Sequence, residues 1–242
     1  MIDLGALRQS LAALCFPPRC LCCDARLASP TPPLFCGECL DKIDFIAAPL
    51  CPVCGRAFPD CAGDNHLCGN CLRHPPHFDS ARAVAHYRDP LAHAIHTFKY
   101  RRHTFGLATF AALLPEGLPA PYLAPDLILP VPLHRQRLRE RGFNQALLLA
   151  RAFYPAQRER IDPEILIRHR ATPPQTGLSG KTRRRNLKGS FLVTDPARLA
   201  GKTILLVDDV FTTGSTANEC ARTLKKDGAR AVHVLTLARV AE

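Results

Sequence analysis

The chain has 242 residues, 47% of them hydrophobic, and a formal net charge of +11. This length and composition allow one large domain or two modest ones with a real core. No stretch approaches the roughly 20 apolar residues that a membrane span needs, so we expect no membrane span. The positive charge favours a polyanionic partner, such as nucleic acid, a phosphorylated metabolite or an anionic membrane surface, although it is also compatible with solubility alone.

The N-terminal segment does not resemble a secretory leader. Its apolar residues are interrupted by Arg8, Gln9 and Ser10, and no basic leader precedes a long apolar core. Residues 3–14 instead predict a short amphipathic helix that packs on the protein. Twelve cysteines would indicate disulfides in a secreted protein, but without a secretory signal we expect a cytoplasmic location and reduced thiols.

Eleven of the cysteines precede residue 72, and most of them fall into two tandem sets with the spacing C-x2-C…C-x2-C. Four thiolates in two short turns provide tetrahedral coordination for Zn²⁺, and a module with so few core residues needs such a metal to fold. The sequence therefore predicts one or two structural zinc ions. The ligands of the first set are Cys20, Cys23, Cys36 and Cys39, and those of the second set are Cys51, Cys54, Cys68 and Cys71.

Three further cysteines in this region are not needed as ligands. Cys22 is an alternative to Cys23, although the x2 spacing favours Cys23 as the partner of Cys20. We interpret Cys15 and Cys61 as free thiols. A redox C-x-x-C motif is a weaker interpretation, because such a motif would stand alone beside a strand–helix pattern.

Prolines at residues 75 and 76 mark a boundary, after which strands and helices alternate. We therefore predict two domains: residues 1–77, with the N-terminal helix and a double zinc ribbon, and residues 78–242. The second domain has the pattern of an α/β fold with a mostly parallel sheet flanked by helices. The expected strands are residues 81–87, 126–133, 165–168, 191–193, 203–207 and 231–237; helices are expected after residue 89, at 104–114, at 145–153 and before Gly228, with an irregular connection at 115–125.

Basic residues gather in three segments of the second domain. Residues 99–103 form either the solvated end of a helix or an anion-binding edge. Residues 134–144 form the most basic segment of the chain. The loop at residues 169–190 is also basic, and a loop of this length inside a compact domain is usually functional or mobile.

The segment from Lys202 to Gly228 carries the most specific chemistry. A buried strand leads into Asp208 and Asp209, and adjacent carboxylates can hold Mg²⁺, accept hydrogen bonds from a diol or transfer protons. A hydroxyl-rich turn then enters a helix, whose N-terminal N–H groups suit a monoester phosphate. Helix capping alone explains one hydroxyl, but not several behind two carboxylates. A ribose 5-phosphate carries both a vicinal diol and a monoester phosphate, so it is the ligand that this segment predicts. The turn consists of Thr212, Thr213, Gly214, Ser215 and Thr216.

The sequence ILLVDDVFTTGSTANE is similar to the 5-phosphoribosyl 1-pyrophosphate (PRPP) binding motif of type I phosphoribosyltransferases. With further motifs, the chain resembles the ComF/GntX family from about Cys15 to the C-terminus. The resemblance implies a double zinc ribbon before a type I phosphoribosyltransferase-like domain, and a role in natural competence, where incoming single-stranded DNA is handled. These motifs are the four cysteine pairs, Phe98-Lys99-Tyr100, Pro130-Val-Pro-Leu133, Arg141-Gly-Phe-Asn-Gln145, and Gln175, Leu178, Arg183 and Asn186.

Carried over to this chain, the resemblance implies that Asp208 and Asp209 hold the ribose hydroxyls and that residues 212–216 hold the 5-phosphate. The turn at residues 131–135 would meet the pyrophosphate, and the loop with Arg183 would form a mobile hood. An active domain would displace pyrophosphate at the anomeric carbon, with Mg²⁺ bridging the pyrophosphate and the ribose hydroxyls. The candidate cations are Lys99, Arg135 and Arg183, for each of which a solvated surface charge is the alternative.

Two other classes of function fit the same sequence. In the first, the protein is a non-catalytic nucleic-acid-binding module that uses the PRPP fold for regulation. Its basic segments 134–144 and 181–188 would then track phosphates, while Tyr100, His103 or Phe143 would stack on bases. In the second, the zinc ribbons dock a helicase-like partner of the transformation machinery, and the protein is an adaptor.

Overall fold

The computed structural model of the chain describes residues 17–58, 63–101, 106–170 and 187–241. Several sequence predictions therefore fall outside the described residues: the helix at 3–14, the thiols of Cys15 and Cys61, and Arg183 with most of the loop around it. Within the described part of the chain, no helix combines the length and the apolar character needed to cross a membrane.

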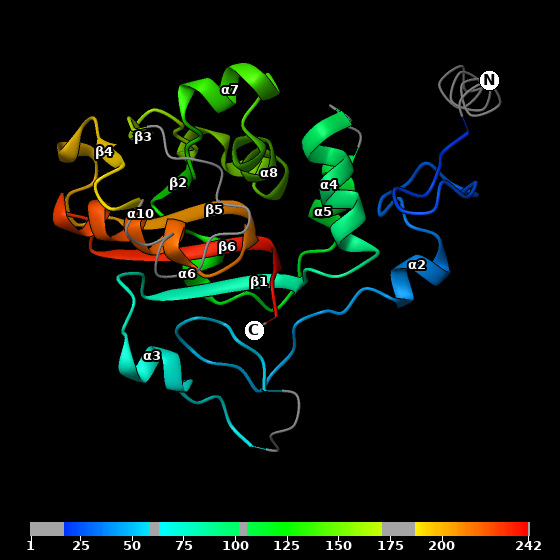
Figure 1. Ribbon diagram of the computed structural model, residues 1–242, viewed down its shortest axis with the longest axis horizontal. Helices are drawn as coiled ribbons and strands as arrows, with labels where there is room; N and C mark the ends of the chain where they lie inside the picture. Colours follow the sequence, from blue (N-terminus) through cyan, green and yellow to red (C-terminus); the bar gives the residue numbers. More distant parts are fainter. Residues whose placement is uncertain (1–16, 59–62, 102–105, 171–186, 242) are drawn as a thin grey trace.

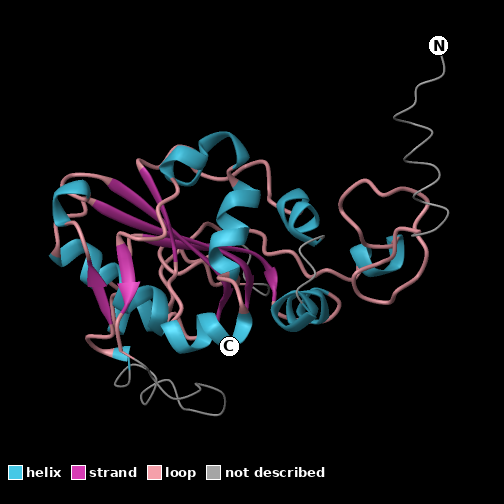
Figure 2. Ribbon diagram, turned by 90° about the horizontal axis from the view of Figure 1, so that it is seen from above, coloured by secondary structure: helices cyan, strands magenta, loops and turns pink. Residues whose placement is uncertain are grey.

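The centre of the molecule is a four-stranded parallel sheet with the strand order β1-β6-β5-β2. This confirms the predicted parallel sheet. Helices lie on both sides of it (Figures 1 and 2), as expected when crossover connections join parallel strands. The strands are β1 (Ser80–His86), β2 (Leu127–Pro130), β5 (Thr203–Phe211) and β6 (Ala231–Arg239), and the larger helices are α4 (Leu91–Arg101), α5 (Leu107–Ala112), α8 (Gln145–Phe153) and α10 (Ser215–Lys226).

The two faces of the sheet bury two separate apolar clusters, because successive side chains of a strand point to opposite faces. In β5, Leu206 belongs to the cluster that includes Leu224 of α10. Its neighbour Leu205 belongs to the cluster that includes Ile95 of α4 and Leu149 of α8. The continuous apolar run in β5 is thus explained by burial on both faces.

The structure differs from the expected elements in three places. The strands β3 (Leu166–Arg168) and β4 (Phe191–Val193) form their own antiparallel pair, outside the parallel sheet. Strand β5 continues through both aspartates to Phe211 instead of ending at Val207. Short helices occupy segments without a predicted element, because three to seven residues are too few for a clear apolar period: α6 (Ala120–Leu123), α7 (Arg135–Arg141), η2 (Pro155–Arg160) and η3 (Pro196–Arg198).

The two cysteine sets each contribute one short helix, α2 (Gly37–Asp41) and α3 (Gly69–Arg73). The second ribbon and α3 lie beside β1 (Figure 1). The backbone N–H of Ala81 in β1 donates to the carbonyl oxygen of Val53 at 2.7 Å, and the N–H of Ile46 donates to the carbonyl oxygen of Val84 at 3.0 Å. The edge of the sheet is therefore covered by the ribbon and by the segment that leads to it, which protects the strand from pairing with another chain.

This docking predicts that Gly55 tolerates no side chain. Gly55 has φ +71°, and a Cβ atom there would lie 2.4 Å from the carbonyl oxygen of Ala81. We expect Gly55→Ala to lower the free energy of unfolding by about 2 kcal/mol or more, from the left-handed backbone and the clash together. Urea denaturation with zinc present measures it. Gly37→Ala is the control, because nothing lies within 4 Å of a Cβ atom there; equal losses in both variants would contradict the prediction.

Candidate functional site

The two aspartates of the PRPP-like motif lie in the last part of β5, at the carboxyl edge of the sheet. Val207, just before them, is fully buried, while both aspartates are partly exposed. In doubly wound sheets this edge is where ligands bind. The neighbouring strand β2 ends at the same level, because Pro130 pairs with Val207. The sheet thus places the carboxylates where the segment after β2 begins.

Asp208 and Asp209 have different surroundings. The Nζ atom of Lys99 on α4 lies 3.0 Å from Oδ2 of Asp209. Burial, followed by the neighbouring charge of Asp209, raises the pKa of Asp208 to about 7, although the backbone N–H of Asp209 and the charges of Lys99 and Arg168 oppose this shift. At neutral pH the pair therefore carries less than its full negative charge until a ligand or cation compensates it.

The hydroxyl-rich turn follows β5 directly and leads into α10. Gly214 is the N-cap residue of α10, with φ +69°, and it makes no side-chain capping hydrogen bond. The hydroxyl oxygens of Thr213 and Ser215 lie 2.8 Å apart. Because glycine has no side chain, the N-cap residue itself cannot cap the helix. The first-turn N–H groups of a helix that begins this way suit an anion.

The structure brings one of the three predicted cations to the aspartates. Lys99 forms the ion pair described above. Arg135 is the first residue of α7, in the segment that leaves the carboxyl end of β2, and its side chain is exposed. Arg183 lies outside the described residues.

Sequence reasoning missed Arg168, which lies at the end of β3. Its Cζ atom lies 5.7 Å from the centroid of the Phe191 ring. Burial lowers the pKa of Arg168, and its charge acts on both Asp208 and Cys220. Nothing in the local sequence marks this arginine, because the strand that holds it is three residues long and pairs with residues more than twenty positions away.

The cysteines form two clusters with the composition that the sequence predicted. In each cluster the four sulfur atoms lie within 4.8 Å of one another. The fold brings Cys23 into the first cluster and leaves out Cys22, the alternative ligand. Four thiols at this spacing fit tetrahedral zinc and no catalytic coordination, because no position is left for water or substrate.

The two clusters differ in their exposure to solvent. All four cysteines of the second cluster are buried, and they belong to the apolar core on the α10 face of the sheet. In the first cluster, Cys20 and Cys39 are buried, Cys36 is partly exposed and Cys23 is exposed. In the second cluster, burial opposes ionisation of Cys51, but N–H groups of Cys54 and Cys68 lower its pKa to about 7, which favours the thiolate that zinc requires.

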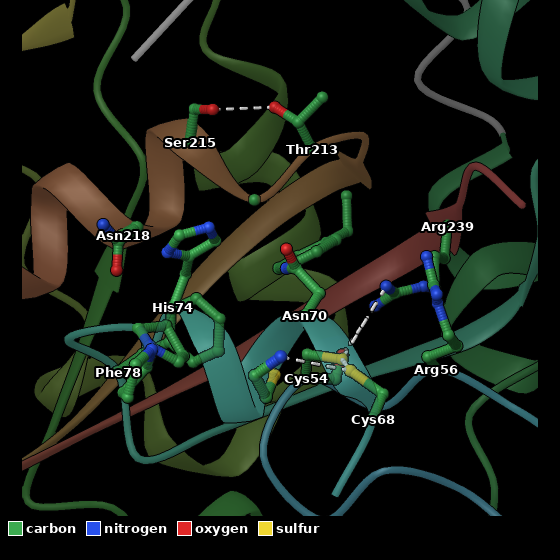
Figure 3. A pocket seen from close by; sticks show the side chains of 15 residues that line it. Cys54, Arg56, Cys68, Asn70, His74, Phe78, Thr213, Ser215, Asn218 and Arg239 are labelled. Atoms are coloured by element: carbon green, nitrogen blue, oxygen red, sulfur yellow. Dashed lines mark hydrogen bonds between the residues drawn. The ribbon is translucent and has the colours of Figure 1, made fainter. Parts of the chain in front are cut away.

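A cavity of about 350 Å³ lies between the second ribbon and the hydroxyl-rich turn at residues 212–216. Figure 3 shows His74 and Asn70 on the ribbon side and Thr213 and Ser215 on the opposite side, with the two hydroxyls facing each other. The residues that line it include Arg56, Asn70, His74, Phe78, Asn218 and Arg239. The second ribbon therefore forms one wall of the space beside the turn.

Comparison with known proteins agrees with this arrangement. Residues 11–72 match a double zinc ribbon domain and residues 160–242 match a phosphoribosyl transferase domain. The chain is 41% identical over 196 residues to the DNA utilization protein YhgH of Escherichia coli K12, covering 78% of this chain and 84% of that protein. It is 36% identical over 217 residues to Competence protein F of Haemophilus influenzae, covering 84% of this chain and 90% of that protein.

The chain belongs to the ComF/GntX family. A more distant relative is Competence protein ComFC of Bacillus subtilis, 29% identical over 214 residues and covering 84% of this chain and 83% of that protein. The family expectation from the sequence, a double zinc ribbon before a phosphoribosyltransferase domain, is confirmed.

The difference in exposure of this ComF/GntX chain's two clusters predicts two rates of zinc loss. We expect a zinc indicator to remove one equivalent quickly, from the first cluster, where Cys23 is exposed, and the other slowly, from the buried cluster. Release is followed by the absorbance of the indicator complex. Cys23→Ser should remove the fast phase and leave the slow one. Release of both equivalents in a single phase would contradict the prediction.

The raised pKa of Asp208 predicts a pH dependence of stability. Its pKa in the folded protein is about 7, against an ordinary value of 3.8. Between these values the native state keeps a proton that the unfolded chain has lost, so stability falls as the pH rises. We expect the free energy of unfolding of the wild type, relative to Asp208→Asn, to fall by about 1 kcal/mol per pH unit between about pH 4 and pH 7, and to level off above.

Denaturation at several pH values measures this difference. Asp195→Asn, at an exposed aspartate, is the matched control for the loss of one carboxylate. A difference between wild type and Asp208→Asn that stays constant with pH would contradict the prediction.

Proposed function

We propose that this protein binds PRPP, or another group that carries a ribose 5-phosphate, at the carboxyl end of β5. The observation that supports this most is the sequence of features along one short segment: two adjacent carboxylates, then a glycine in the left-handed conformation, then a helix of twelve residues without a side-chain cap. Carboxylates accept hydrogen bonds from a diol, and uncapped N–H groups bind a phosphate. A phosphorylated ribose carries both a diol and a phosphate.

In this proposal, each part of the site has a separate task. Asp208 and Asp209 accept hydrogen bonds from the ribose hydroxyls, and residues 212–216 bind the 5-phosphate with their N–H and hydroxyl groups. Ligand hydroxyls then compete with Lys99 for Asp209, which frees the ammonium group to turn towards the pyrophosphate. Arg135, at the start of the exposed helix after β2, is our second candidate for that role.

Phosphoribosyl transfer is the reaction that such a site supports. The bond between the anomeric carbon and a pyrophosphate oxygen breaks, pyrophosphate leaves with the bonding electrons, and an acceptor nucleophile forms the new bond. Lys99 and Arg135 would neutralise the leaving group. Mg²⁺, if held beside Asp208 and Asp209, would supply further positive charge for the leaving group.

A second part of the proposal concerns DNA. The names of the relatives refer to competence and DNA utilization, and α7 offers a surface suited to a polyanion. This helix has the sequence RQRLRER and no buried residue. We propose that it contacts the phosphates of single-stranded DNA, in the cytoplasm, where the zinc-binding thiols stay reduced. Docking of a helicase-like partner on the ribbons is the alternative, for which the exposed Leu72 is a candidate contact.

Calorimetric titration with PRPP and Mg²⁺ tests the ligand. We expect the double variant Asp208→Asn with Asp209→Asn to bind at least about tenfold more weakly than the wild type, because hydrogen bonds to two charged acceptors are weakened. Asp195→Asn should bind like the wild type. Equal affinities of the double variant and the wild type would remove the assigned roles, and lack of binding by the wild type would remove the ligand.

A salt titration of binding to single-stranded DNA tests the second part. We expect log affinity to fall steeply with log salt, and the slope to decrease by about 0.7 for each phosphate contact that is removed. The variant Arg135→Gln with Arg139→Gln removes two exposed cations of α7. Arg158→Gln with Arg230→Gln removes two exposed cations elsewhere and should leave the slope unchanged. Identical slopes for both double variants would exclude α7 as the contact surface.

A further inference from the structure

Arg239, at the end of β6, connects the second cysteine cluster to the strand that carries the aspartates. It is 5% exposed, and its guanidinium donates a hydrogen bond to the carbonyl oxygen of Cys54. Its Nη2 atom also lies 3.9 Å from the Cys54 sulfur atom. Cys54 is one of the four residues of the buried cluster. A metal-binding thiolate is usually held by such a neighbouring donor, which fixes its orientation.

The other side of the same guanidinium lies against Phe211, the last residue of β5. The Cζ atom of Arg239 is 4.7 Å from the centroid of the Phe211 ring, within the range of a cation–π contact. The ends of the two strands are also joined through the backbone, because the N–H of Val240 donates to the carbonyl oxygen of Phe211 at 2.9 Å. Arg239 therefore fixes the position of the Phe211 ring as well as that of Cys54.

The Phe211 ring also supports residues 212–216, which are proposed to bind the phosphate and are called the phosphate turn below. A Cβ atom on Gly214 would lie 2.5 Å from the ring edge of Phe211, so the turn rests directly on this ring. Phe78, between the second ribbon and β1, packs edge-on against the same ring with centroids 6.0 Å apart. Elsewhere, the cavity of about 350 Å³ separates the ribbon from the turn. Figure 3 shows Arg239 on the far side of this cavity from Asn218 of α10.

We propose that Arg239 is a positioning residue through which zinc at the second cluster sets the geometry of the phosphate turn. This inference rests on the proposed ligand of that turn. Zinc fixes Cys54; Cys54 fixes the guanidinium; and the guanidinium holds Phe211 beneath Gly214. Loss of zinc releases Cys54, so the turn no longer has its N–H groups fixed for a phosphate. By linkage, a phosphate ligand that stabilises the turn must also stabilise zinc at the second cluster.

The test measures the effect of PRPP on zinc release from the full-length protein. In the wild type, saturating PRPP should slow the slow phase of zinc release to the indicator by about fivefold or more, the lower end of measured couplings, and leave the fast phase unchanged. In Arg239→Met, PRPP affinity at full zinc occupancy should fall by a similar factor, and PRPP should no longer slow zinc release. Arg239→Lys should also lose the linkage, because an ammonium group lacks the planar fork that bonds Cys54 and stacks on Phe211.

Arg230→Met is the matched control, because Arg230 precedes the opposite end of the same strand and is exposed. It should keep both the affinity and the linkage. If Arg239→Met does not fold, as judged by circular dichroism, the inference is tested by the wild type and by Arg239→Lys alone. A wild type that binds PRPP without any effect on zinc release, or Arg239 variants that keep the effect, would overturn the inference while the ligand stands. A wild type that does not bind PRPP would remove both.

Discussion

The structure depends on how two adjacent carboxylates are tolerated at the end of a buried strand. Charges that are close and partly withdrawn from water repel each other strongly, so at least one of them must be paired or protonated. In this fold, Lys99 of α4 forms an ion pair with Asp209, and the backbone N–H of Asp209 donates a hydrogen bond to Asp208. Helix α4 supplies Lys99, and Arg168 at the end of β3 carries a charge that also acts on Asp208. Asp209 is therefore ion-paired, while Asp208 keeps a raised pKa.

The second zinc ribbon belongs to this arrangement and is not a separate appendage. Its cysteines share an apolar cluster with residues of β5 and α10, and it lines the cavity beside the hydroxyl-rich turn. The first ribbon is more exposed and packs with the cluster on the other face of the sheet. Two modules that look like a repeat in sequence therefore have different structural positions. Among the described residues, the second ribbon lines the cavity beside the turn and the first does not.

Features encoded by short-range patterns could be predicted from the sequence. The cysteine spacing identified both sets of four, and the alternation of apolar runs with helical periods predicted the parallel sheet. The acid pair and the turn were identified because their residues are contiguous. Contacts between distant residues could not be predicted in the same way. Arg239 meets Cys54 across 185 positions, and neither residue's neighbours indicate the other. The antiparallel pairing of β3 with β4 was missed for the same reason, since each strand is only three residues long.

Burial and the neighbouring Asp209 keep Asp208 partly protonated near neutral pH until a ligand compensates the charge of the pair. Carbon NMR of the aspartate side chains, with Asp208→Asn used for assignment, measures this directly. Without ligand, the Asp208 carboxyl carbon should titrate near pH 7. With PRPP and Mg²⁺ bound, its titration should move to lower pH, so that both carboxylates are ionised at neutral pH. Titration of Asp208 near its ordinary value without ligand, or an unchanged titration when PRPP is present, would contradict the account.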